Sequence, residues 1–459
     1  MSIQAAFIVP HPPLIVPEVG GGKENVVQAT IDSYHAVARR IAQIKPRTIF
    51  LISPHAASYA DYIHISPGDS ASGSLGNFGA PEVYKVKYDA PLVKEIRLLC
   101  GAEDFPAGTL GEREPSLDHG VLVPLHFINR YFTDYMLVRC AISGLSWREH
   151  YRFGRLVRQA AQQLGRDTVI VASGDLSHRT TPDGPYGFSA EGPELDRQLV
   201  KIMRSANFGD FFSLDTVLVE KAAECGLKSF IIMAGALDGR KVQTQFYSYE
   251  KQTGVGYALC GYTDEGECDE RKFLDIEEEN SRRHMQALRL EESVYVRLAR
   301  EALEGYIKNG KLPPLPQDLP AELTQSSAGV FVSLKKHGQL RGCIGTIEPT
   351  LPNISAEIRQ NAVSAATRDP RFPTVTEGEL AEIVYHVDVL SPAVPCHKKE
   401  LDARRYGVIV SSGAKRGLLL PDLEGIDTVD QQIEIARRKA GIEYNEKYTL
   451  ERFEVERHE

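Results

Sequence analysis

The sequence predicts an α/β protein of two domains, in which a mostly parallel sheet with helices on both faces precedes a smaller α+β domain. Short β-rich runs alternate with longer amphipathic stretches in the first half of the chain, which is typical of parallel strands joined by crossover helices. A charge-dense segment then ends this pattern. The chain has 459 residues, which is too long for a single hydrophobic core.

The expected elements of the first domain follow one another at short intervals. Strands are expected at AAFIV (5–9), TIFLIS (48–53), YMLVRCAIS (135–143), TVIVAS (168–173) and VGYALCGY (255–262). Helices are expected at 26–44 and 149–164, because apolar residues recur there with a period near 3.6. These elements predict a first domain over residues 1–262.

Residues 263–284 are rich in charge and nearly free of β-branched residues, so they form either a solvated linker or a polar helix. The second domain is expected over residues 285–459. It begins with a helical pattern at 294–307, and a proline-rich stretch follows. Its clearest strands are GVFVSLKK (329–336), IVYHVDVLS (383–391) and GVIVSS (407–412).

The composition excludes several classes of protein. The net charge of −9 argues against nucleic acid or an anionic membrane as the main partner. No apolar run approaches the roughly 18–20 residues that span a bilayer. The seven cysteines are an odd number without a CxxC pair, which fits a reduced, cytoplasmic chain.

Three histidines fall just after expected strands. His11 follows AAFIV, His55 follows TIFLIS, and His178 lies a few residues past TVIVAS. In open α/β sheets, ligands bind beyond the carboxyl ends of the strands, so these side chains are expected at one edge of the sheet. A lone histidine in a loop is usually a surface residue, but three at equivalent strand ends predict a metal or catalytic site.

Four motifs of the first domain occur in the order found in a known family. They are His-Pro-Pro at 11–13, Ser-Pro-His at 53–55, Asp-His-Gly at 118–120 and Gly-Asp-Leu-Ser-His at 174–178. Together they resemble the landmarks of the LigB-like class III extradiol dioxygenases and of the related Memo proteins, over residues 1–262. The resemblance implies a site in which two histidines and one carboxylate hold Fe²⁺, with His11 and His55 as the two histidines.

The third ligand has two candidates. Glu224 is the best match to the carboxylate that the dioxygenases use, whereas Cys225 matches a Cys-Gly pair that supplies a ligand in Memo-like proteins. Neighbouring residues on a helix point about 100° apart, so both side chains are not expected to reach one metal ion. We favour Glu224, and Cys225 is otherwise a small buried packing residue.

The resemblance also implies roles for three further residues. His178 matches the catalytic acid–base histidine, His119 matches a histidine near the metal or substrate, and Asp175 is expected to orient its loop. Capping of a turn is the alternative reading of Asp175. The implied reaction is ring cleavage of an aromatic diol by O₂. The alternative is a metal-binding module that oxygenates nothing, for which Zn²⁺ or copper is also possible.

The second domain contains four motifs in the order of another family. They are Leu-Arg-Gly-Cys-Ile-Gly at 340–345, Arg-Asp-Pro-Arg-Phe-Pro at 368–373, His-Val-Asp-Val-Leu-Ser-Pro at 386–392 and Gly-Leu-Leu-Leu-Pro at 417–421. They resemble the AMMECR domain of the AmmeMemoRadiSam system. This resemblance implies joint action with a radical SAM partner, which another chain would supply because no CxxxCxxC cluster occurs here.

The Leu-Arg-Gly-Cys-Ile-Gly motif itself predicts a turn between glycines that presents Arg341 and Cys343 in a cleft. Glycines allow close approach of a ligand to the backbone, and an arginine beside a cysteine lowers the pKa of the thiol. Asp369 and Arg371 are expected to pair with each other or to line the same cleft. The alternative is a tight turn around a buried cysteine.

Overall fold

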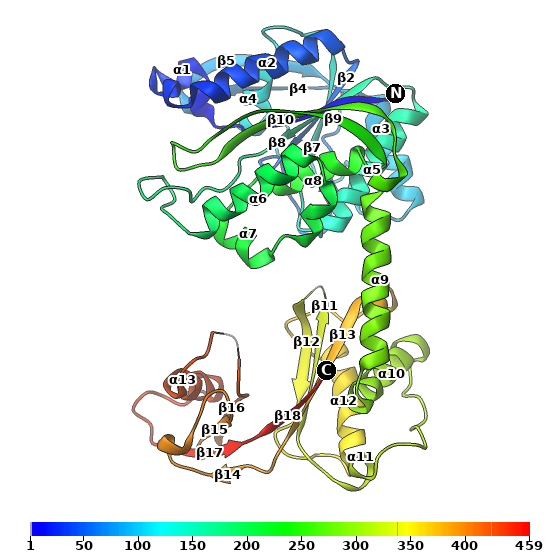
Figure 1. Ribbon diagram of the computed structural model, residues 1–459, viewed down its shortest axis with the longest axis vertical. Coiled ribbons are helices and arrows are strands. Elements are labelled where there is room, and N and C mark those ends of the chain that lie inside the picture. The colour runs from blue at the N-terminus through cyan, green and yellow to red at the C-terminus, as the bar shows by residue number, and fades with distance from the viewer. Residues whose placement is uncertain (1, 337, 424) are drawn as a thin grey trace. The chain divides into compact units, whose positions relative to one another are not determined.

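The structure is a computed structural model that describes residues 2–336, 338–423 and 425–459. The chain divides into two compact units, Met1–Glu279 and Asn280–Glu459, and Figure 1 shows the elements of each. Among the described residues, no helix combines the length and the apolar character that crossing a membrane requires. We describe each unit by itself.

The first unit alternates strands and helices. Its strands are β1 (Ile3–Val9), β2 (Thr48–Ser53), β3 (Ile63–His64), β4 (Ser70–Leu75), β5 (Ala80–Lys87), β6 (Ala107–Gly108), β7 (Met136–Ala141), β8 (Thr168–Ser173), β9 (Arg240–Glu250) and β10 (Tyr257–Glu267). Its helices are α1 (Pro17–Gly20), α2 (Gln28–Ile44), α3 (Ala90–Ala102), α4 (His119–Ile128), α5 (Trp147–Gln163), α6 (Glu191–Ser205), α7 (Thr216–Ala222) and α8 (Leu227–Ala236), and α9 (Phe273–Glu291) begins in it.

Six of these strands form the main sheet, in the order β7-β2-β8-β1-β10-β9. The first four are parallel, and β10 and β9 add an antiparallel hairpin at one edge. The prediction of a mostly parallel sheet is therefore confirmed. Strand β9 was not among the predicted strands, because its sequence RKVQTQFYSYE is largely polar, as suits an edge strand with one exposed face.

Helices cover both faces of this sheet (Figure 1). Apolar residues of α3, α5, α6 and α8 form one core cluster with one face of the sheet, and those of α2 and α4 form a second cluster with the other face. Successive side chains of β2 alternate between them: Phe50 and Ile52 enter the first cluster, and Ile49 and Leu51 enter the second. The strand reads as a continuous apolar run because both of its faces are buried.

The second unit contains two four-stranded sheets. Its strands are β11 (Val330–Lys336), β12 (Gln339–Gly345), β13 (Ile383–Leu390), β14 (Val394–Pro395), β15 (Gly407–Ser412), β16 (Lys415–Leu419), β17 (Thr449–Phe453) and β18 (Val455–His458), and its helices are α10 (Val294–Asn309), α11 (Ala321–Gln325), α12 (Ile354–Thr367) and α13 (Val429–Ala440). The order β12-β11-β13-β18 makes the first sheet, and β14-β17-β15-β16 makes the second. The three predicted strands of this unit are β11, β13 and β15.

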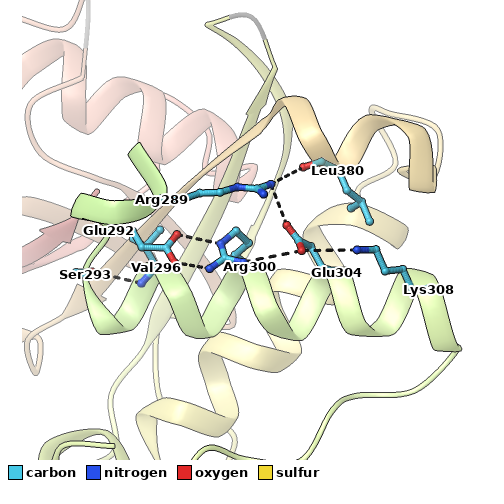
Figure 2. A network of polar contacts seen from close by, with 8 residues as sticks. All are labelled: Arg289, Glu292, Ser293, Val296, Arg300, Glu304, Lys308 and Leu380. Atoms are coloured by element: carbon cyan, nitrogen blue, oxygen red, sulfur yellow. Dashed lines mark hydrogen bonds and ion pairs between the residues drawn. The ribbon is translucent and has the colours of Figure 1, made fainter. Parts of the chain in front are cut away.

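The first sheet packs one face against α10 and α12, and their apolar residues form a single cluster with it. A charged network fixes the start of α10 (Figure 2). Arg300 forms two hydrogen bonds to Glu292, at 3.0 and 2.5 Å, and Arg289 pairs with Glu304 at 3.1 Å. The network joins the end of α9 to α10 within the second unit.

The charge-dense segment 263–284 forms the end of β10 and the greater part of α9, so most of it is regular secondary structure.

Candidate metal centre

Three neighbouring strands of the main sheet carry the site at their carboxyl ends. His11, His55 and Asp175 each lie two residues beyond the end of β1, β2 and β8, respectively. Because β2, β8 and β1 are adjacent and parallel, these positions meet at one edge of the sheet. The backbone N–H of His11 donates to Oδ1 of Asp175 at 2.8 Å, which holds two of the loops together.

Two histidine nitrogens and one sulfur converge at this edge. Nε2 of His55 lies 2.9 Å from Nε2 of His11, and Sγ of Cys225 lies 3.6 Å from the same His11 atom. The ligand atoms of these three residues all lie within 4.8 Å of one another. Atoms bonded to one metal ion at about 2.0–2.3 Å lie on the order of 3.0–3.7 Å apart, so the two distances from His11 are close to the spacing of metal ligands.

Glu224 and Cys225 occupy the turn between α7 and α8, and their side chains diverge. The Glu224 carboxylate accepts a hydrogen bond from the backbone N–H of Leu227 at 2.5 Å and so caps the start of α8. Burial there raises the pKa of Glu224 to about 7. The structure therefore brings Cys225 to the histidines and turns Glu224 away from them, which does not agree with the preference for Glu224 drawn from the sequence.

Glycines bring the two loops close enough for this arrangement. A Cβ atom on Gly174 would lie only 2.1 Å from Cα of Gly226, so the loop after β8 and the turn before α8 pack backbone against backbone. The Asp175 carbonyl oxygen accepts from the N–H of Gly226 at 3.0 Å, and the N–H of Asp175 donates to Sγ of Cys225 at 3.3 Å. These contacts fix the thiol beside His11.

The protonation states suit a metal ligand set. His11 is 2 % exposed, and burial together with the neighbouring imidazoles holds its pKa well below the usual value, so the ring is neutral. Its Nδ1 atom lies 2.9 Å from Oγ of Ser173, which leaves Nε2 directed at His55 and Cys225. Burial and the carboxylates of Asp175 and Glu224 raise the pKa of Cys225. A metal ion would therefore displace a proton from this thiol.

The other two predicted histidines border the same site. His119 is the first residue of α4, and its ring centroid lies 4.1 Å from that of His55. Burial and the charge of His55 lower the pKa of His119 to about 4. His178 stacks on Tyr186 at 5.1 Å, and its ring lies with Asp175 and Cys225 in a second group of closely spaced ligand atoms. Burial raises the pKa of Asp175 to about 7.

A buried ion pair connects the end of β2 and the start of α4 to β7. The sequence analysis did not predict this pair. Arg139 on β7 is 1 % exposed and pairs with Asp118 at 2.9 Å. Asp118 also accepts from Oγ of Ser53 at 2.5 Å, which links the end of β2 to the start of α4. The signal was an arginine inside the apolar strand YMLVRCAIS, since a buried charge requires a partner.

The four predicted residues of the second unit form two separate groups. Arg341 forms two hydrogen bonds to Glu379, at 2.9 and 3.1 Å. Asp369 accepts from the N–H of Cys343 at 2.9 Å and from Arg371 at 2.6 Å. An irregularity in the pairing of β11 with β12 falls at Arg341, which sends its side chain away from Cys343.

Two expectations for this motif are wrong. Residues 339–345 form strand β12 and not a turn, and burial raises the pKa of Cys343, which the sequence predicted to be lowered. Its glycines also serve packing: a Cβ on Gly342 would lie 2.2 Å from the carbonyl oxygen of Ala365, and one on Gly345 would meet the ring of Phe331.

Comparison with known families assigns both units. Residues 5–260 match the family model described as the catalytic LigB subunit of aromatic ring-opening dioxygenase. The chain belongs to the LigB family. Residues 296–458 match the AMMECR1 family, so a LigB domain is followed by an AMMECR1 domain.

One relative matches the whole chain, and others match part of it. A protein of Clostridium acetobutylicum is 41 % identical over all of this chain and 99 % of its own length. A protein of Thermotoga maritima is 52 % identical over 36 % of this chain and 98 % of its own length. Among solved structures, an uncharacterized protein of Pyrococcus horikoshii is 32 % identical over 36 % of this chain and 88 % of that chain, with a TM-score of 0.33. An uncharacterized protein of Escherichia coli is 16 % identical over 56 % of this chain and 99 % of that chain, with a TM-score of 0.38.

Proposed function

We propose that the LigB domain is a non-heme iron oxidoreductase of the extradiol dioxygenase type, with His11, His55 and Cys225 as ligands of Fe²⁺. The convergence of their Nε2 and Sγ atoms within 4.8 Å of one another carries this proposal. Two histidines and one anionic ligand on one side of the ion leave positions open for an aromatic diol and O₂. Bound iron would lower the pKa of the hydroxyl groups of the diol.

The remaining residues of the site would handle the substrate and its proton. Desolvation and the charge of His55 lower the pKa of His178, so its ring is neutral near pH 7 and free to accept a proton from a bound diol. Phe78 and Tyr186 are 46 % and 60 % exposed and lie against His119 and His178, respectively. Their rings would contact the faces of a planar aromatic substrate.

A second candidate function is a metal-binding module that performs no oxygenation and acts with a radical SAM partner. The position of Cys225 favours it, because a thiolate suits Cu⁺ or Zn²⁺ better than a carboxylate does. The fused AMMECR1 domain is consistent with a shared task, since one chain keeps both domains at high effective concentration. The cytoplasmic location inferred from the cysteine pattern stays a prediction.

Metal analysis of proteins purified without oxygen tests the ligand set. Wild type and Glu224→Gln are expected to retain iron, whereas His11→Ala and Cys225→Ser are expected to lose most of it. Glu224→Gln is the matched control, because residue 224 neighbours Cys225 but its side chain caps α8. Iron that survives Cys225→Ser and disappears in Glu224→Gln would refute the ligand assignment.

Oxygen uptake by the iron-loaded protein with a panel of catechols then separates the two functions. Uptake is expected in wild type and is expected to fall by about 10²–10⁴-fold in His178→Ala, which keeps its iron, because a positioned acid–base residue contributes roughly that factor. Iron-loaded wild type that consumes no oxygen with any catechol would favour the non-oxygenating function.

A further inference from the structure

One face of the first sheet of the AMMECR1 domain packs on the helices, and the opposite face carries polar side chains beside Phe331 and Leu390, which pack against the second sheet. Along β11, Val332 and Leu334 enter the core beneath α10 and α12, so Ser333 between them points to the opposite face. Ser333 pairs with Cys343 on β12 and with His386 on β13. Because directly paired residues share a face, the three side chains form a row across the polar face.

This row is held by side-chain contacts and is partly buried. The Ser333 hydroxyl donates to Sγ of Cys343 at 3.2 Å. Nδ1 of His386 lies 3.4 Å from a carboxylate oxygen of Glu459, and the imidazole is 21 % exposed. The row thus brings a thiol, a hydroxyl group and an imidazole together on one side of the sheet, next to the packed second sheet, which makes it a candidate site.

Cations surround the Cys343 end of the row. The Arg371 guanidinium is fixed by two hydrogen bonds to Asp369, and it also donates to the carbonyl oxygen of Cys343 at 3.4 Å. Lys439 on α13 lies close enough for its charge to interact with the Arg371 guanidinium and with the sulfur of Cys343. Desolvation and the Arg371 charge lower the pKa of Lys439, as expected of two cations held near each other.

The carboxylates near this face already have partners, but two of its cations do not. Asp369 pairs with Arg371, Asp388 lies 3.5 Å from Arg457, and Glu459 pairs with His386. Within the part of the chain that the structure describes, the ammonium groups of Lys335 and Lys439 form no ion pair or hydrogen bond. Lys335 and Lys439 therefore place two ammonium groups without a paired carboxylate beside the hydrogen-bonding groups of this face.

We propose that this face binds a small ligand with an oxyanion group, a carboxylate or a phosphate, which lies between Arg371 and Lys439. The Ser333 hydroxyl and the Cys343 thiol would contact the rest of the ligand. A planar guanidinium held by Asp369 is preorganised for such an oxyanion, and Lys439 adds a mobile point charge. Because burial keeps Cys343 in its neutral form, the thiol serves as a polar contact and not as a nucleophile.

Alkylation of Cys343 in the full-length protein locates binding at this face. The rate of modification by iodoacetamide is measured at each cysteine by peptide mass spectrometry, with inorganic phosphate or acetate added at constant ionic strength. The oxyanion is expected to slow modification of Cys343 at least about threefold. Cys396, in the same domain, is the internal control and should keep its rate. Protection by phosphate alone or by acetate alone identifies which oxyanion chemistry the face prefers.

Lys439→Gln tests the charge that the proposal requires, and Lys311→Gln, after α10, makes the same charge change elsewhere in the domain. Lys439→Gln is expected to abolish protection. At Cys343, the ratio of the modification rate with iodoacetate to that with iodoacetamide should also fall by about threefold to tenfold, because the attraction for the anionic reagent is lost. Lys311→Gln should change neither result.

Three results would overturn the proposal. The first is equal modification of Cys343 with and without both oxyanions, and the second is unchanged protection in Lys439→Gln. The third is a Cys343 that neither reagent reaches in the native protein although both modify it after unfolding, because a ligand-binding face must admit molecules of that size.

Discussion

The two domains each place a partly buried cysteine within a polar cluster, but the clusters have opposite character. Burial raises the pKa of both Cys225 and Cys343, so both are thiols in the isolated protein. Cys225 lies among neutral imidazole nitrogens and a carboxylate, which offer electron pairs to a cation. Cys343 lies beside a hydroxyl group, a guanidinium and an ammonium group, which suit an anion. The neighbours of a cysteine, and not the cysteine itself, decide which ligand its surroundings can bind.

The two sites also differ in how they are supported. Each domain has an Asp–Arg ion pair next to its site. The Asp118–Arg139 side chains are 10 % and 1 % exposed, whereas those of Asp369 and Arg371 are 2 % and 54 % exposed. The first pair is buried and holds the loop after β2 against the start of α4, whereas the second presents its arginine to solvent. Breaking the first should therefore cost far more stability than breaking the second.

The largest expected effect follows from Arg139→Met. The substitution leaves the Asp118 carboxylate buried without its partner, so the free energy of unfolding should fall by about 3–5 kcal/mol. Urea unfolding followed by the fluorescence of Trp147, the only tryptophan of the chain, reports on the LigB domain.

Arg371→Met is the matched control in the AMMECR1 domain. Its expected loss of stability, measured by circular dichroism, is about 1 kcal/mol or less, because the guanidinium is exposed and the Asp369 carboxylate keeps the backbone N–H groups of Cys343 and residue 371 as donors. Equal losses in the two variants would remove the distinction between a buried and an exposed support.

A smaller effect is expected when a residue that orients a metal ligand is removed. Ser173→Ala deletes the contact to Nδ1 of His11 and should weaken Fe²⁺ binding about 10–100-fold in an anaerobic chelator competition. Ser229→Ala is the control, because the hydroxyl of Ser229 is equally buried but forms no hydrogen bond with any described residue. An unchanged affinity in Ser173→Ala would show that packing alone orients His11.

The smallest effect contrasts the pH dependence of two buried carboxyls. Burial raises the pKa of Asp196, which accepts from the N–H of Ser177, to about 6. Because this lies above the value near 3.9 of an unfolded chain, the stabilising contribution of Asp196 is complete only below about pH 4 and is lost as the pH rises through 6. As the pH rises from 5 to 8, the free energy of unfolding of Asp196→Asn should therefore increase relative to that of wild type by about 1–2 kcal/mol.

Asp369→Asn should behave in the opposite way. The hydrogen bonds from Arg371 hold the pKa of Asp369 well below its usual range. Its stabilising contribution is present above about pH 4 and is lost as the pH falls through the folded-state pKa, so the deficit of Asp369→Asn should be largest near neutral pH. Thermal unfolding of both variants across this range checks the two signs, and parallel pH profiles would contradict them.

The sequence predicted the elements and the edge of the sheet that carry the first site. Strands β2 and β8 begin and end where their apolar runs do, and His11 and His55 stand beyond parallel strands as expected. It placed His178 at the third strand end, yet Asp175 holds the equivalent position, two residues after β8. Position at a strand end therefore marks the site correctly, but at β8 the residue in that position is Asp175 and not His178.

Other features could not be predicted because they depend on distant contacts. Glu224 and Cys225 were treated as helical neighbours, but Ala223 adopts a φ of 53° and ends α7 before them. The turn that follows is fixed by the approach of Gly226 to Gly174, about fifty residues earlier in the chain. In the AMMECR1 domain, the irregular pairing at Arg341 has no counterpart in the sequence pattern.

Local periodicity by itself determined the parallel strands of the main sheet, helices α2 and α5, and the two-domain α/β architecture, because burial on one or both faces of an element leaves its mark in neighbouring residues. Only the tertiary structure decided that Cys225 and not Glu224 meets His11, and that Cys343, Ser333 and His386 share one face. The direction of a side chain at a turn and the register between strands are set by contacts between segments far apart in the chain, which no local pattern contains.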